Sequence, residues 1–118
     1  MVAPNILVLG AALLAQAADL PPQRAHALAN LASYVRSGDM PVELVAGGPL
    51  NVRVHFELSV TPEGRVSACR VTQSSGVSQL DAITCRIMRS RARFEPARDS
   101  EGRPVPDIVT SVIAWVAS

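Results

Sequence analysis

Aromatic residues are scarce in this sequence, since Phe, Trp and Tyr together make up 3% of its 118 residues. Hydrophobic residues still make up 48%, so a buried core must be built mainly from Val, Ile, Leu and Ala. An excess of charge of one sign is also missing, because the formal net charge is +1. A nucleic-acid-binding domain of this size is usually more basic, so the composition argues against a nucleic-acid partner. The length suits one small domain.

Motifs for catalysis and for cofactor binding are missing too. The sequence has no Gly-x-Ser-x-Gly elbow, no Walker loop and no dinucleotide fingerprint. Ser74 and Ser75 have no base and orienting acid in a recognisable pattern, and turn formation or helix capping explains them better. We therefore predict a protein that is not an enzyme, with no catalytic residue, no cofactor, no metal site and no small-molecule substrate.

A hydrophobic run long enough to span a bilayer is the next absence. Residues 6–18 are nearly all apolar, but a spanning helix needs about 20 such residues. The run has the length of a signal-peptide h-region, and Ala15-Gln16-Ala17 fits the small-x-small cleavage rule, although no Lys or Arg precedes it. We expect residues 1–17 to be a signal peptide and the mature chain to be periplasmic. The alternatives are a buried N-terminal helix and an uncleaved anchor in the inner membrane.

The rest of the chain divides into a short N-terminal linker and a domain. Residues 18–38 are polar and rich in alanine, which indicates an N-terminal linker with a short helix at 25–35. The domain itself is expected at 39–118. Hydrophobic and polar residues alternate strictly over 52–60, which predicts a strand with one buried face. A Pro- and Gly-containing turn at 61–64 and a second strand at 65–72 complete a β-hairpin.

A helix and a last strand follow the hairpin. Leu80, Ile83 and Ile87 are spaced for one face of a helix over 79–91, with Ser78 as its N-cap. Residues 108–116 are rich in Val and Ile, which predicts a strand. The order strand, strand, helix, strand predicts a two-layer α+β fold, in which one helix packs on a three-stranded antiparallel sheet.

Two cysteines, Cys69 and Cys85, stand 16 positions apart in the sequence. The sequence contains no CxxC pair, so it gives no support for zinc or thioredoxin-like chemistry. An even cysteine count in an exported chain favours a disulfide. Cys69 shares its strand face with Val71 and should point toward the helix, where Cys85 borders the apolar stripe. We predict a Cys69–Cys85 disulfide, and the alternative is two buried thiols.

Five short pieces of the sequence stand in the order, and near the spacings, of one domain family. They resemble the TonB family C-terminal domain over about two thirds of the chain, with Met40-Pro41 where that family usually has Tyr-Pro and Asn51 where it has glycine. The pieces are Pro62-Glu63-Gly64-Arg65-Val66, Val71-Thr72-Gln73-Ser74-Ser75-Gly76, Leu80-Asp81, Arg93-Phe94-Glu95-Pro96-Ala97 and Gly102-Arg103-Pro104-Val105.

The resemblance implies a mode of action. In TonB domains the final strand offers a free sheet edge to an extended segment of an outer-membrane transporter, called the TonB box. Unpaired edge amides and carbonyls suit such strand addition. The alternatives are an ordinary sheet edge and an edge that pairs with a second copy in a homodimer. We therefore expect the partner-binding residues to lie on the last strand and to be Ile108, Val109, Ser111, Ile113 and Trp115.

Two functions are compatible with this resemblance. The first is a periplasmic TonB-like protein-binding module linked to TonB-dependent outer-membrane transport, whose partner is a segment of a TonB-dependent transporter or another envelope protein. The second is a stand-alone periplasmic structural or regulatory domain that does not transduce energy. TonB energy transducers carry a long Pro-rich spacer, and Pro21-Pro22 is too short to be one, which favours the second.

Overall fold

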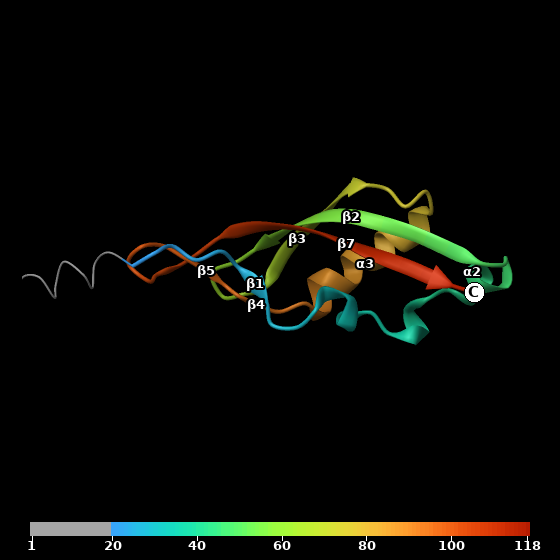
Figure 1. Ribbon diagram of the computed structural model, residues 1–118, viewed down its shortest axis with the longest axis horizontal. Coiled ribbons are helices and arrows are strands. Elements are labelled where there is room, and N and C mark those ends of the chain that lie inside the picture. Colours follow the sequence, from blue (N-terminus) through green and yellow to red (C-terminus); the bar gives the residue numbers. More distant parts are fainter. Residues whose placement is uncertain (1–19) are drawn as a thin grey trace, which may run out of the picture.

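The computed structural model describes residues 20–118, so the expected signal peptide at 1–17 lies outside the described residues. Three long strands form an antiparallel sheet in the order β3-β2-β7. They are β2 (Leu50–Val60), β3 (Val66–Gln73) and β7 (Asp107–Ala117), and helix α3 (Ser78–Arg91) covers one face of their sheet (Figure 1). The two-layer α+β fold predicted from the sequence is confirmed, and the bounds of its four elements agree within two residues.

The central strand β2 organises the core. Val54, Phe56, Leu58 and Val60 are buried, and the residues between them are only half-buried. This is the alternation that one covered sheet face produces. β2 pairs with β7 along its whole length without a register shift, from Leu50 opposite Ala117 to Val60 opposite Asp107. Its pairing with β3 contains two register shifts.

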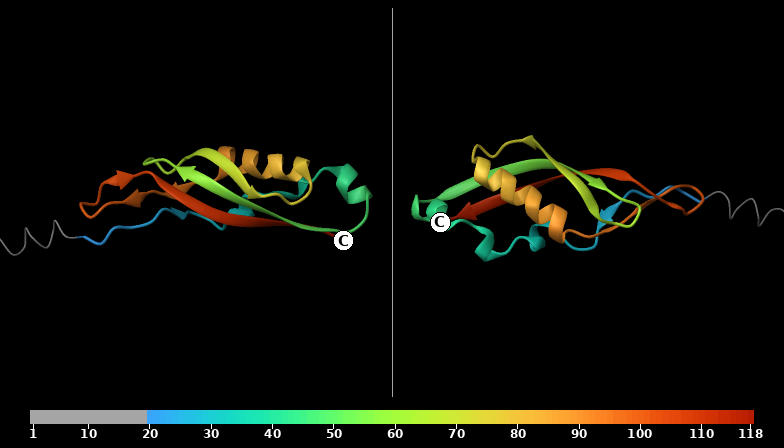
Figure 2. Two further views of the ribbon diagram at one scale, coloured as in Figure 1. Left: turned by 90° about the horizontal axis from the view of Figure 1, so that it is seen from above. Right: turned by 180° about the vertical axis from the view of Figure 1, so that it is seen from behind.

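The apolar stripe of α3 fills the other side of the core. Leu80, Ile83, Ile87 and Met88 are all buried against the sheet. The stripe and the covered sheet face form one hydrophobic cluster, and Figure 2 shows α3 lying along that face of the sheet. The helix begins differently from the prediction, because Val77 is the N-cap and no side chain caps it. The carboxylate of Asp81 instead accepts hydrogen bonds from Ser75 N at 3.0 Å, from Ser75 Oγ at 2.7 Å and from the Ser74 hydroxyl.

The turn between β2 and β3 docks against the segment that follows α3. Gly64 adopts φ +82°, a backbone conformation that glycine adopts without a steric penalty. The backbone N–H of Phe94 donates to the Gly64 carbonyl at 2.9 Å. A Cβ at position 64 would clash with the carbonyl oxygen of Phe94. The glycine predicted to suit this turn is therefore also required by a tertiary contact.

Residues 20–41, termed here the N-terminal segment, pack on the domain and do not form a free linker. β1 (His26–Ala27) pairs with β4 (Phe94–Glu95), and η1 (Leu31–Tyr34) and η2 (Ser37–Asp39) are short 3-10 turns. The short helix expected at 25–35 is therefore wrong. Backbone pairing with residues 93–98 holds residues 23–28 extended, and this pairing outweighs the intrinsic helical propensity of their Ala, Leu, Arg and Gln residues.

The remaining elements are short. Helix α2 (Val42–Ala46) leads into β2, and β5 (Ala97–Arg98) pairs with β6 (Pro104–Val105) before β7. Strands β5 and β6, together with the start of the N-terminal segment, form a narrow extension beyond the helix-covered sheet (Figure 1). The C-terminus lies at the opposite end of the molecule.

Candidate partner-binding edge

Strand β7 has one free long edge. It pairs with β2 on one side, and no other strand among residues 20–118 pairs with its second side. The register with β2 is continuous over eleven residue pairs, so the pairing of β7 contains no bulge. An edge of this kind presents a row of backbone groups ready for another strand.

A side-chain contact identifies which backbone groups of β7 point outward. The Arg24 guanidinium donates from Nη2 to the carbonyl oxygen of Ile108 at 2.8 Å. Because Arg24 approaches from the side away from β2, the backbone groups of Ile108 face the free edge. Backbone groups in an antiparallel strand alternate between its two sides. The amides of Thr110, Val112, Ala114 and Val116 therefore also point outward, and no backbone acceptor within the described part of the chain receives them.

The side chains predicted to bind a partner divide between the two faces of the sheet. Ile108 lies on the open face and is 45% exposed. Val109 and Ser111 are half-buried, and Ile113 and Trp115 are each 3% exposed on the face toward α3. The Trp115 Nε1 donates to Thr84 Oγ1 at 2.9 Å. The partner-binding role of this set stays a prediction, and Trp115 has a structural role in addition.

Sequence reasoning missed the other apolar side chains of the edge strand. Val112 is 42% exposed and Val116 65% exposed, both on the open face of the sheet. Alternation alone does not reveal them, because β7 carries apolar residues on both faces from Ile108 to Val116. Only the side on which α3 packs distinguishes the two sets.

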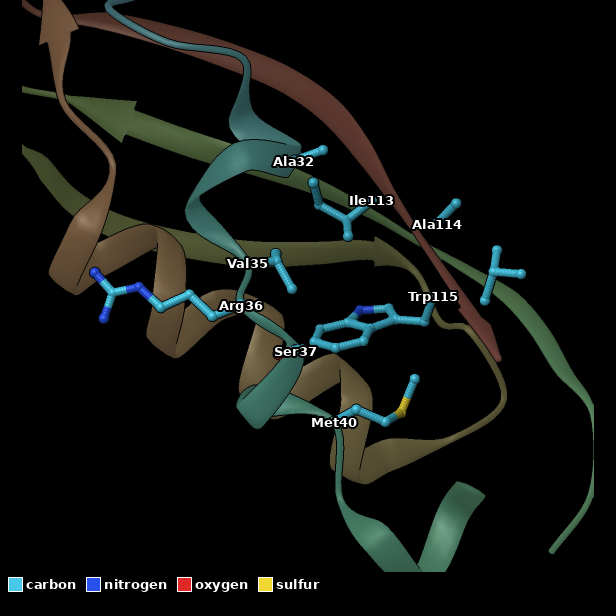
Figure 3. Close-up of a pocket in the computed structure, with 9 residues that line it drawn as sticks. Ala32, Val35, Arg36, Ser37, Met40, Ile113, Ala114 and Trp115 are labelled. Atoms are coloured by element: carbon cyan, nitrogen blue, oxygen red, sulfur yellow. The ribbon is translucent and has the colours of Figure 1, made fainter. Parts of the chain in front are cut away.

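A groove runs beside the C-terminal half of this edge. It has a volume of about 240 Å³ and lies between β7 and the N-terminal segment. The close-up in Figure 3 shows Ala32, Val35 and Met40 on one wall and Ile113 and Trp115 on the other. Arg36 and Ser37 also line it, and the Arg36 guanidinium points away from the indole. Apolar side chains thus stand on both walls of the groove, and Arg36, Ser37 and backbone groups give the lining a polar part as well.

Two ion pairs fasten the N-terminal segment beside the edge. Arg24 Nε lies 2.8 Å from an Asp107 carboxylate oxygen, which also accepts from the backbone N–H of Ala25 at 2.9 Å. The hydrogen bond from Arg24 lowers the pKa of Asp107 to about 2, although desolvation opposes this shift. The start of the N-terminal segment is thereby held to the start of β7.

The second ion pair lies at the other end of the segment. Arg91 binds both carboxylate oxygens of Asp39, at 2.7 and 3.0 Å, and also donates to the Tyr34 carbonyl at 2.9 Å. The hydrogen bond from Arg91 lowers the pKa of Asp39 to about 2, although desolvation again opposes this shift. The end of the N-terminal segment is thereby held to the end of α3.

The two cysteines form the predicted disulfide between β3 and α3. Cys69 and Cys85 are bonded, with their Cα atoms 5.4 Å apart. Cys69 lies on the sheet face toward the helix, opposite the buried Leu58 of β2. The bond joins the two layers on the side of the sheet away from β7. It therefore leaves the free edge unobstructed.

Neither a membrane helix nor a metal centre is found in the part of the chain that the structure describes. No helix there is long and apolar enough to cross a membrane, and no three His, Cys, Asp or Glu side chains are grouped to hold a metal ion.

The comparison with family models decides the assignment. The model described as Gram-negative bacterial TonB protein C-terminal matches residues 50–116, a range that runs from the start of β2 to near the end of β7. The chain belongs to the TonB C-terminal family. The matched range contains the hairpin, α3 and the edge strand. The groove's second wall, formed by residues 32–40, lies outside the match. A comparison with curated protein sequences gave no significant match.

Membership of the TonB C-terminal family has a direct functional meaning. The chain is a TonB-like module of the bacterial envelope, and the family is transport-related and non-enzymatic. TonB C-terminal domains interact with envelope proteins such as outer-membrane transporters.

Proposed function

We propose that this protein is a periplasmic TonB-like binding module that adds an extended segment of a TonB-dependent outer-membrane transporter to the β7 edge. The single observation that carries the proposal is the free edge itself, with its row of unpaired outward amides at Thr110, Val112, Ala114 and Val116. Main-chain hydrogen bonds to such an edge supply affinity, and alternate side chains supply selectivity. The protein acts by binding, without catalysis.

One observation favours a second candidate, a stand-alone periplasmic domain that binds envelope proteins without transducing energy. An energy transducer needs a spacer that reaches across the periplasm. Here residues 20–28 fold back along residues 93–100, with backbone hydrogen bonds such as Gln23 N to Arg98 O at 2.9 Å. This stretch is part of the folded body and adds no reach. Both candidates use the same edge and differ in the identity of the partner.

The test exploits the alternation of the edge amides. Val112→Pro removes an outward N–H, and Ser111→Pro removes one that points to β2. Val112→Thr is the matched control, because it changes the side chain and keeps the N–H. Each purified domain is used as bait for solubilised envelope proteins, bound proteins are identified by mass spectrometry, and folding is checked by circular dichroism and thermal unfolding.

We expect wild type and Val112→Thr to retain an outer-membrane transporter, and Val112→Pro to lose it while still folded. Ser111→Pro should lower the melting temperature, because it breaks the β2–β7 ladder. Retention of the transporter by folded Val112→Pro at the wild-type level would remove the edge from consideration. Recovery of a different envelope protein that depends on the same N–H would favour the stand-alone domain.

A further inference from the structure

The groove and the free amides of β7 form one continuous feature. The groove is lined by Ile113, Ala114, Trp115 and Val116, and the outward amides of Ala114 and Val116 lie along its rim. A strand added to this edge would lie in the plane of the sheet, directly beside the groove. Its alternate side chains would then point to the open face and to the groove.

We propose that the partner is an extended segment carrying an apolar side chain that enters this groove. The N-terminal segment, which forms one wall of the groove, then selects partners by the side chain at that one position of the added strand. The inference rests on the proposed function, because it requires the edge to accept a strand. It adds a selecting element formed by residues 32–40, which the matched family range does not contain.

The position of the selecting side chain follows from strand geometry. Cross-strand neighbours share one face of a sheet, so the partner residue opposite Trp115 points to the same side as the indole. That side is the groove, whose far wall is Ala32, Val35 and Met40. The neighbouring partner residue, opposite Ala114, points to the open face and to solvent. The two adjacent positions therefore meet different surroundings.

The size and lining of the groove define the side chain that it accepts. Its volume is about 240 Å³, and an apolar cavity of about 150 Å³ already holds a benzene ring. An aliphatic side chain such as Leu, Ile or Met fits this space and would cover apolar carbon on both walls. An amide side chain of the same size would place polar atoms against the carbon atoms of Val35, Met40 and Trp115, and only Arg36, Ser37 and backbone groups could offer hydrogen bonds, so it should bind less well.

Arg24 limits where the added strand can pair. Its Nη2 already occupies the Ile108 carbonyl at 2.8 Å, and its Nε is held by Asp107. The partner's main chain must therefore pair between Thr110 and Val116. This register places one partner side chain opposite Trp115 whichever way the added strand runs.

An intramolecular probe tests the inference without a known partner. An Asn-Gly turn followed by a nine-residue threonine strand is appended after Ser118 of the full chain, so that a hairpin brings the new strand onto β7. The tether supplies a high effective concentration. With this turn, the fourth residue of the new strand lies opposite Trp115 and the fifth opposite Ala114. Leu and its near-isostere Asn are compared at the fourth position, and the same pair at the fifth is the control.

The readout is amide hydrogen exchange at Thr110, Val112, Ala114 and Val116, measured by NMR. We expect protection of these amides in the extended protein, and about tenfold greater protection with Leu than with Asn at the fourth position, as burial of one aliphatic side chain predicts. At the fifth position the difference should be much smaller. Ala32→Leu, which fills the groove from its other wall, should abolish the preference at the fourth position and leave the edge protected.

The outcomes separate this inference from the function on which it rests. Edge protection with equal Leu and Asn values at the fourth position overturns the groove and leaves strand addition intact. A Leu preference of the same size at both positions, or one that persists in Ala32→Leu, also overturns it. No protection in any extended variant overturns the groove and the binding edge together.

Discussion

The indole Nε1 of Trp115 donates a hydrogen bond to Thr84 Oγ1 at 2.9 Å, and neither residue is more than 3% exposed. The Thr84 hydroxyl donates in turn to the Leu80 carbonyl at 2.8 Å. This chain of two bonds ties the end of the edge strand to the middle of α3. It also holds the indole as a wall of the groove.

Loss of the Thr84 hydroxyl should therefore destabilise the domain. Thr84→Val keeps the shape and leaves the buried indole N–H without an acceptor, which costs about 1–3 kcal/mol. Thr84→Ser keeps the hydroxyl and is the control for it. Urea unfolding monitored by tryptophan fluorescence measures the difference. Equal free energies of unfolding for Thr84→Val and wild type would show that the bond contributes nothing to stability.

Gly64→Ala should destabilise the hairpin turn. The substitution forces a Cβ onto a positive φ and against the Phe94 carbonyl, a combination worth about 1–3 kcal/mol by the strain alone. Gly38→Ala is the matched control, because a Cβ there meets no atom within 4 Å. Thermal unfolding of the two variants should differ clearly, with Gly38→Ala close to wild type. A Gly64→Ala variant as stable as Gly38→Ala would contradict the docking of this turn.

Reduction of the Cys69–Cys85 bond should lower the free energy of unfolding by about 3 kcal/mol, as expected for a loop of this length. Denaturant titration with and without reductant measures the loss. A Cys69→Ala, Cys85→Ala double variant is the control, and its stability should not respond to reductant. If wild type also fails to respond, the bond does not stabilise the fold.

Stability should fall in acid through Asp39 and Asp107, whose folded-state pKa values are lowered to about 2 by Arg91 and Arg24 respectively. The pKa of an unfolded Asp is about 3.9, so the unfolded chain binds more protons between these values. The free energy of unfolding therefore rises as the pH is raised from about 2 to about 5. The stability that these two carboxylates contribute is lost as the pH falls through the same range. Asp39→Asn should flatten the profile, and the exposed Glu101→Gln is the control. A profile for Asp39→Asn that is as steep as wild type would assign the acid sensitivity to other groups.

The sequence predicted the parts of the fold that depend on local pattern. Alternation over β2 and the apolar spacing of α3 each specify a buried face, so their positions and the two-layer arrangement could be predicted. Cys69 and Cys85 could be paired because their elements were already placed. The prediction that Ser78 caps the helix was wrong. The Asp81 carboxylate accepts hydrogen bonds from Ser74 and Ser75 and organises the start of α3 in place of a conventional N-cap.

The groove could not be predicted because it depends on contacts distant in sequence. Residues 20–41 have no regular pattern of their own, and their position is set by pairing with residues 93–100 and by the Arg24–Asp107 and Asp39–Arg91 ion pairs. The sequence likewise did not show which face of β7 is buried, because apolar residues stand on both faces of this strand. Such features become visible only when the helix and the N-terminal segment are placed.

The opposite placement of the two chain ends has a practical consequence for handling the protein. The backbone N–H of Leu20 donates a hydrogen bond to the Ser100 carbonyl in the narrow extension. Ser118 lies at the opposite end of the molecule, directly after the part of β7 that lines the groove (Figure 1). A resin or surface attached on the N-terminal side of Leu20 therefore holds the molecule with its groove at the end away from the support. A purification tag joined to Ser118 starts beside the groove and competes with any incoming strand, so capture experiments require the tag at the other end.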